Sequence, residues 1–248
     1  MRSSRIRRFG ACLVLVALSV PGAAPAIDAP GAPGAPWATD FATDRSQLAS
    51  VGSNPYFILE PGYSLVLEAG PSRMVVTVLD ETRVVDGVET RAVEERETWK
   101  GQVTELSRNF LAIHKQTHDV LQFGEEVSNF RNGKVVNRAG TWMAGMGHAR
   151  AGLVLPGQVR VGYRYYEEQA PGVTMDRAEI VSVTLTQKTP AGTFENCVRT
   201  QVTSPMSPGD KEYRCYAPGI GLVKFESMLL VEHGFRQGSR PVKAGGGS

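Results

Sequence analysis

Two cysteines, Cys197 and Cys215, are the residues whose type and spacing point most directly to a specific chemistry. They lie at equal distances from Met206, within a turn-like segment, residues 204–209, which is rich in serine, proline and glycine. The flanking runs, residues 193–203 and 211–217, alternate apolar and polar side chains as strands do. A hairpin centred on the turn would place the two sulfurs opposite each other, at a spacing that disulfide geometry accepts. We therefore predict a disulfide here, with two free buried thiols as the alternative.

A second candidate for chemistry is a metal site. Met143, Met146 and His148 lie close together in a glycine-containing segment. Thioether and imidazole donors on a flexible loop suit Cu(I), so these residues define a candidate copper site. The alternative is that Trp142 and the methionines close an open end of the protein by apolar packing.

Acidic side chains give weaker indications of catalysis. Glu168 and Asp176 flank a turn and are a candidate glycosidase-like pair, although a solvated hairpin end also explains them. Neighbouring carboxylates such as Glu167 and Glu168 would point to opposite faces of a strand and could not act on one substrate. The chain contains no Gly-x-Ser-x-Gly motif and no glycine-rich phosphate loop after a strand. We therefore assign no catalytic residue, and a hydrolase that uses scattered acidic side chains remains an alternative.

Aromatic side chains provide the remaining functional hypothesis. We expect Tyr163, Tyr165, Trp142 and Phe123 to lie on the concave face of a sheet and to bind an apolar or amphipathic ligand. The alternative is that they fill the hydrophobic core.

The elements that position these residues are strands. Asp86-Gly87 and Asn132-Gly133 are strong hairpin signals, because type I′ turns need positive φ at both central positions. Between such turns, residues 178–188 and 222–231 alternate apolar and polar side chains. Residues 91–99 are expected to form a long, solvent-exposed strand. The sequence thus predicts an all-β fold: an antiparallel meander of about ten to twelve strands, coiled into a strongly curved sheet, an open half-barrel or a barrel.

The sequence also predicts how the chain is divided into segments. Residues 1–26 combine four arginines, a short apolar run and an Ala-x-Ala site, as secretory signal peptides do. Residues 27–54 are expected to be a Pro/Ala/Gly-rich linker, residues 55–236 the β domain, and residues 237–248 a flexible tail. Export would place the cysteines in an oxidising compartment. After removal of the signal, no transmembrane segment is expected.

Charge limits the possible partners. Four of the 27 basic residues and none of the 25 acidic ones lie in residues 1–26, so the remaining chain has a formal charge of −2. A mildly acidic surface with mixed charges provides no footprint for phosphates, so nucleic acid is not an expected partner. No cofactor motif is present.

Two C-terminal segments, TPAGTFENC and EYRCYAPGIGLVKFE, resemble a signature of secreted bacterial proteins without an assigned activity. Further segments resemble the same group, and together they span nearly all of residues 54–233. At the level of architecture, the expected half-barrel is similar to periplasmic lipoprotein-carrier folds, which is an analogy of fold and does not fix function. The resemblance implies no catalytic residue. Cys215 stands where such proteins often carry an aromatic residue, which would make the predicted disulfide particular to this chain.

These observations predict a secreted or periplasmic, non-enzymatic β domain that binds an apolar or amphipathic ligand or an envelope protein. A periplasmic copper-binding protein and a hydrolase are the alternatives.

Overall fold

The computed structural model describes residues 35–41 and 44–235, which form β-strands and one short 3-10 turn, η1 (Arg45–Gln47). Most strands belong to two meanders. The N-terminal meander consists of β4 (Tyr63–Ala69), β5 (Ser72–Val85), β6 (Val88–Trp99), β7 (Gln102–His114) and β8 (Val120–Arg131). The C-terminal meander consists of β12 (Arg164–Tyr166), β13 (Arg177–Thr189), β14 (Gly192–Ser204), β15 (Ser207–Ala217), β16 (Gly221–Phe225) and β17 (Met228–Phe235).

The two meanders form one antiparallel sheet because the first strand of the N-terminal meander pairs with the last strand of the C-terminal meander. Strand β17 pairs with β4, with Leu230 opposite Leu67, so the ends of the β domain meet in the middle of the sheet. The main hydrogen-bonded path then runs β10-β8-β7-β6-β5-β4-β17-β16-β15-β14-β13-β12. This arrangement confirms the predicted all-β antiparallel meander.

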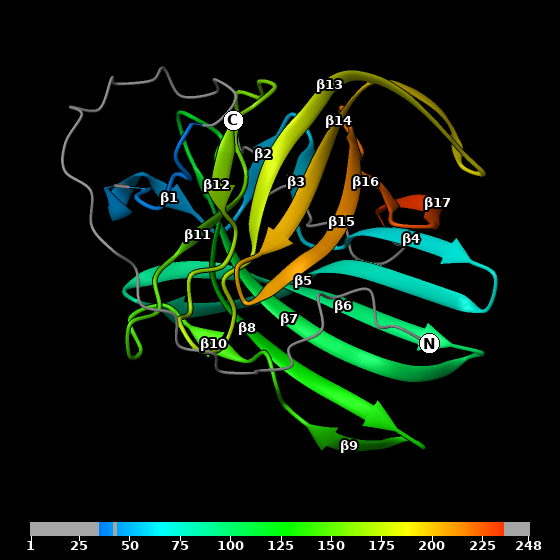
Figure 1. The fold of residues 1–248 in the computed structure, drawn as a ribbon, viewed down its shortest axis with the longest axis horizontal. Helices are drawn as coiled ribbons and strands as arrows, with labels where there is room; N and C mark the ends of the chain where they lie inside the picture. Colours follow the sequence, from blue (N-terminus) through cyan, green and yellow to red (C-terminus); the bar gives the residue numbers. More distant parts are fainter. Residues whose placement is uncertain (1–34, 42–43, 236–248) are drawn as a thin grey trace, which may run out of the picture.

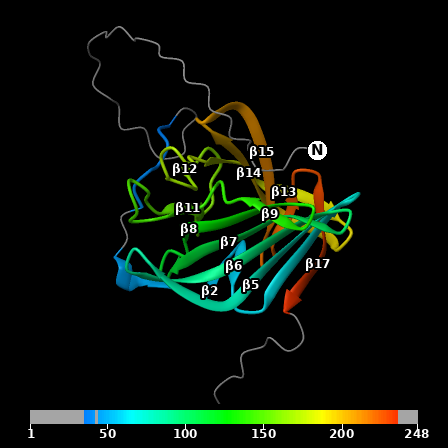
Figure 2. The ribbon, with the colours of Figure 1, turned by 90° about the horizontal axis from the view of Figure 1, so that it is seen from below.

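Short strands complete the fold at its edges. Strands β1 (Leu48–Ala49), β9 (Lys134–Asn137), β10 (Trp142–Met143) and β11 (Gly152–Leu155) add to β7 or β8, and β2 (Gly52–Asn54) pairs only with β3 (Phe57–Leu59). In Figure 1, β5 to β8 run across the lower part of the view, whereas β13 to β15 run up it. Figure 2 shows β5 to β8 side by side as one curved layer. The sheet therefore bends sharply between its two halves.

The predicted turn chemistry is present. Asp86 and Gly87 have φ values of 47° and 75°, and Asn132 and Gly133 have values of 53° and 72°. Each pair forms the two-residue loop of a hairpin, β5–β6 and β8–β9 respectively. Positive φ at both positions is the requirement of a type I′ turn, and glycine meets it without steric cost.

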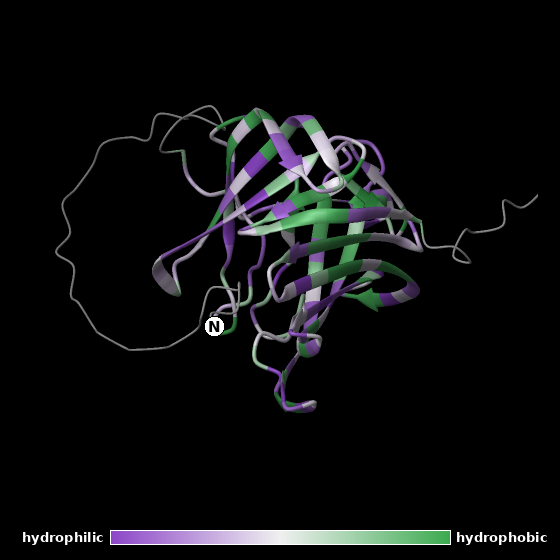
Figure 3. Cartoon of the chain, turned by 90° about the vertical axis from the view of Figure 1, so that its right-hand side faces the viewer, coloured by the Kyte–Doolittle hydropathy of each residue, from purple (hydrophilic) through white to green (hydrophobic). Residues whose placement is uncertain are grey.

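Apolar side chains form two clusters. One cluster includes Phe110, Trp142 and Tyr165, and the other includes Leu67, Met74 and Leu230. Hydrophobic and hydrophilic positions alternate along many strands in Figure 3. This alternation gives each strand one face for the interior.

Three expectations need correction. The predicted linker, residues 27–54, is in part built into the fold: Ala38 bonds through its backbone to Arg164 and Tyr166, and the buried Asn54 side chain donates to two carbonyl oxygens. Residues 91–99 do form a strand, but its first part is not exposed, since Arg91 and Val93 are buried. The predicted signal peptide and tail lie outside the described residues.

The predicted disulfide is the third correction. Cys197 and Cys215 are free and buried, and Cys215 pairs with Arg199, two residues away from Cys197. The cause is an irregularity near the turn. Between the pairs Ser204–Ser207 and Val202–Glu212, one residue of β14 faces four residues of β15. Diagonal positions on adjacent strands are about 7–8 Å apart, farther than most disulfides span.

Candidate functional site

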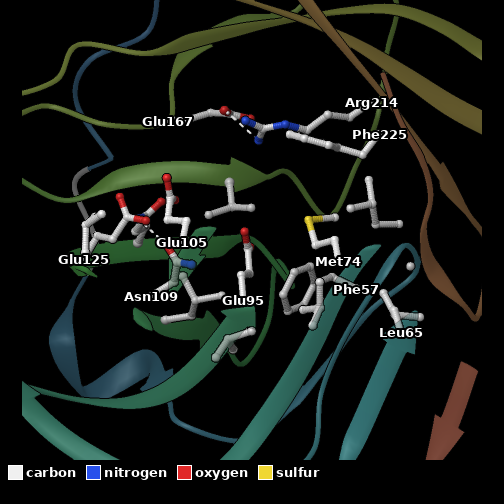
Figure 4. Close-up of a pocket in the computed structure, with 18 of the residues that line it drawn as sticks. Phe57, Leu65, Met74, Glu95, Glu105, Asn109, Glu125, Glu167, Arg214 and Phe225 are labelled. Atoms are coloured by element: carbon white, nitrogen blue, oxygen red, sulfur yellow. Dashed lines mark hydrogen bonds and ion pairs between the residues drawn. The ribbon is translucent and has the colours of Figure 1, made fainter. Parts of the chain in front are cut away.

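A cavity of about 600 Å³ lies between the two meanders. The N-terminal meander contributes side chains from β4 to β8, and the C-terminal part of the chain contributes side chains from β15, β16 and the segment between β12 and β13. Figure 4 shows the two contributions on opposite sides, with Arg214 and Glu167 across from Glu95 and Glu105. A volume of this size falls within the range of small-molecule sites.

One end of the cavity is apolar. Phe57, Leu65, Met74 and Phe225 gather on the right of the close-up. Further apolar lining comes from Val76, Val78, Val93, Leu111, Ile220 and Leu222. The β5 residues Met74, Val76 and Val78 are two residues apart because alternate side chains of a strand share a face. This end offers a surface for a hydrocarbon group.

The other end is polar and acidic. Glu95 on β6, Glu105 and Asn109 on β7, and Glu125 on β8 lie together on the left of the close-up. Strands β7 and β8 pair with each other, and this pairing places Asn109 directly opposite Glu125. Glu105 and Glu125 are buried, at 6% and 1% exposure. The Gln122 Nε2 donates to Asn109 Oδ1 at 2.9 Å and fixes that amide.

A charged triad lies on the opposite wall. Arg214 donates from Nη1 to Glu167 Oε2 at 3.1 Å and from Nε to Glu212 Oε1 at 2.7 Å. The two carboxylates are 4% exposed, whereas the Arg214 side chain is 23% exposed. The guanidinium also faces the Phe225 ring, 5.7 Å from its centroid. Buried charges must be paired in this way because each loses its hydration.

Glu167 holds its proton unusually tightly. Its pKa is raised to about 8, chiefly by burial and further by the neighbouring carboxyls Glu212, Asp176 and Glu168, against the lowering effect of Arg214. Near neutral pH the triad therefore contains one ion pair, Arg214 with Glu212, together with a largely protonated Glu167. The Glu167 Oε1 is buried and accepts or donates no hydrogen bond among the described residues.

The structure brings the predicted glycosidase-like pair to this cavity. Glu168 and Asp176 both line it, and Glu168 accepts a short hydrogen bond from Thr174. The expectation that Glu167 and Glu168 cannot face one site is wrong. They follow β12 in a bend rather than within a strand, so alternation does not apply and both line the cavity. Alternation does hold for Glu125, which is buried, while Glu126 pairs with Arg83 at the surface.

The four predicted ligand-binding aromatics lie elsewhere. Trp142, Phe123 and Tyr165 are buried in the first apolar cluster, and Tyr163 packs against it. None of them lines the cavity. The prediction of a ligand surface made by these residues is therefore not met, and core filling describes them. The aromatic side chains that do line the cavity are Phe57, Tyr63, Tyr216 and Phe225.

The candidate copper donors do not share one environment. Met143 is buried, and its Sδ lies where a side chain on Gly124 would be. Met146 and His148 are exposed in the following turn. Within residues 35–41 and 44–235, no group of three or more His, Cys, Asp or Glu side chains is placed to hold a metal ion. Nor does that part of the chain contain a helix with the length and apolar character needed to cross a membrane.

Sequence reasoning missed the acidic wall. Glu95, Glu105 and Glu125 occur in strands with many charged residues, where a solvent-exposed face is the ordinary expectation. The signal available in the sequence was the even spacing of Glu105 and Asn109, which puts both on one face of a strand.

No family model, no curated protein and no solved structure matches this chain.

Proposed function

We propose that this protein binds an amphipathic small molecule in the cavity between its two meanders. The observation that carries the proposal is the division of one cavity into an apolar end, around Met74 and Phe225, and a polar end, around Glu105 and Glu125. A ligand with a hydrocarbon part and a polar head would bury each part against matching side chains.

The apolar end would supply most of the affinity. Removing hydrocarbon from water contributes about 25 cal/mol per Å² of buried apolar surface. The polar end would orient the ligand, because buried polar groups without partners are costly and select a head group that can satisfy them. We propose a small-molecule ligand as the partner, in preference to an envelope protein, because the cavity has the size of a small-molecule site.

We also propose a secreted or periplasmic location, supported by the signal-like residues 1–26 and by the resemblance to secreted bacterial proteins. A carrier of an amphipathic molecule is consistent with such a location, since these molecules need protection from water between membranes.

The test is a titration with dodecyl maltoside below its micellar concentration, followed by native mass spectrometry and intrinsic fluorescence. Saturable binding of one molecule is expected. Val76→Phe should abolish it, because Val76 lines the apolar end. Val75→Phe is the matched control: the neighbouring position faces away from the cavity and should leave binding unchanged. Failure of the wild-type protein to bind any alkyl amphiphile would overturn the proposal.

A hydrolase is the second candidate, and one observation favours it. Glu167, with a pKa of about 8, would be a proton donor near neutral pH, and Glu168 and Asp176 line the same cavity. Incubation with a panel of aryl glycosides tests this candidate. Turnover that disappears in Glu167→Gln would support it, and no turnover by the wild-type protein would count against it.

A further inference from the structure

We propose that the head group of the ligand is cationic, so that the cavity takes an amine-bearing or quaternary ammonium amphiphile. This inference rests on the proposed function and specifies the substrate class of the same cavity.

The first argument is the charge of the lining. Seven carboxyl side chains and two arginines line the cavity; the carboxyls are Glu95, Glu105, Glu125, Glu167, Glu168, Asp176 and Glu212, and the arginines are Arg131 and Arg214. Arg214 is already held between Glu167 and Glu212. Arg131 is exposed at the end of β8. The lining therefore holds more carboxyl groups than cationic side chains, even when Glu167 is left out of the count.

The second argument is independent of the acidic wall. Glu167 is 3% exposed and lines the cavity, and its Oε1 has no hydrogen-bond partner in the part of the chain that the structure describes. Such buried oxygens normally have a partner. An ammonium group or another N–H donor in the cavity would supply it, and a positive charge there would favour the ionised form of Glu167, whose Oε1 can then accept.

The third argument is the location of the carboxyls. Glu125 and Glu105 are buried at the polar end of the cavity, and charges interact more strongly in a protein interior than in water. A cationic head group would be attracted to carboxyl oxygens at this end, whereas an anionic head group would be repelled by them. Because the apolar end is continuous with this wall in the same cavity, a cation with a hydrocarbon tail fits both ends.

The experiment compares three twelve-carbon amphiphiles below their micellar concentrations: dodecyltrimethylammonium, dodecyl maltoside and dodecyl sulfate. Isothermal titration should give an affinity for the ammonium compound at least about tenfold higher than for the maltoside. The sulfate should bind more weakly than the maltoside. Added salt should reduce the preference for the cation, because screening weakens attraction between charges.

The variants locate the effect. Glu125→Gln should reduce affinity for the ammonium compound by about tenfold and leave the maltoside unchanged. Glu126→Gln is the matched control, since Glu126 is the next residue and lies at the surface beside Arg83. Should Glu125→Gln fail to fold, Glu95→Gln provides the same comparison at a half-buried position of the same wall.

The outcomes separate the two proposals. Equal affinity for all three compounds, or tighter binding of the sulfate, would overturn the inference and leave the proposed function standing. Absence of binding by all three would overturn the proposed function itself.

Discussion

The guanidinium of Arg214 on β15 donates to the carboxyl of Glu167, 3.1 Å away in the segment that follows β12. The contact ties the middle of the C-terminal meander to its edge and leaves both groups in the wall of the cavity. Because Glu167 is buried and Arg214 is shared with Glu212, this wall is sensitive to pH and to the loss of the cation.

Glu167 should make stability depend on pH. Its folded-state pKa of about 8 lies above the ordinary value of 4.5, so the folded protein keeps a proton that the unfolded chain loses between these values. Its contribution to stability is therefore complete below about pH 4.5 and is lost as the pH rises through 8. The groups that act on Glu167 are Arg214, Glu212, Asp176, Glu168, Tyr165 and Tyr216.

Glu167→Gln removes this titration. Relative to wild type, the variant should gain roughly 2–4 kcal/mol of unfolding free energy between about pH 5 and about pH 8. Urea unfolding over that range measures the difference. Glu168→Gln is the control, at the adjacent residue that also lines the cavity. A constant difference between Glu167→Gln and wild type would contradict the raised pKa.

Arg214→Met should destabilise the protein by about 3 kcal/mol near neutral pH, because it leaves the buried Glu212 carboxylate without its cation and removes the donor to Glu167. The loss should shrink in acid as the carboxyls become protonated. Arg83→Met, which removes a surface ion pair with Glu126, should cost less than about 1 kcal/mol. Equal losses for the two variants, measured by chemical denaturation, would argue against a buried triad.

Gly152→Ala should destabilise the protein by steric overlap. A Cβ at Gly152 would lie 2.0 Å from the carbonyl oxygen of Glu167, which is backbone and cannot move aside cheaply. We expect a loss of about 3 kcal/mol, at the upper end of overpacking costs. Gly101→Ala separates this effect from backbone strain: Gly101 has positive φ but nothing within 4 Å, so about 1 kcal/mol is expected.

The two buried cysteines should be free in the folded protein. Alkylation in denaturant without reductant, followed by peptide mapping, should label both Cys197 and Cys215. Without denaturant, labelling should be slow, because burial raises the pKa of the Cys215 thiol to about 11 and the thiolate is the reactive form. Recovery of the two peptides joined to each other and unlabelled would show that the disulfide forms and would contradict this prediction.

The fold follows from local signals that the sequence displays. Asp86-Gly87 marks a two-residue turn, and Ser182, Thr184 and Thr186 alternate with apolar neighbours along β13. Each of these signals concerns residues close in sequence, and the backbone conformation they require is local. They were therefore sufficient to predict strands, turns and an antiparallel meander.

The site depends on relationships that no local signal carries. The pairing of β17 with β4, and the register that places Cys215 opposite Arg199, follow from long-range packing and from a bulge near Ser204. Alternation shows which residues share a face, but it does not show whether that face lies inside. For this reason the sequence pattern is that of ordinary surface residues at Glu105 and Glu125, although both side chains are buried.

Methyl NMR of protein labelled at its methionines tests ligand binding in the cavity most directly. Met74 and Met143 are both buried, but only Met74 lines the cavity. Titration with dodecyltrimethylammonium should shift the Met74 methyl resonance in a saturable manner and leave that of Met143 unchanged. An unperturbed Met74 resonance at saturating amphiphile, or a larger shift at Met143, would contradict the account.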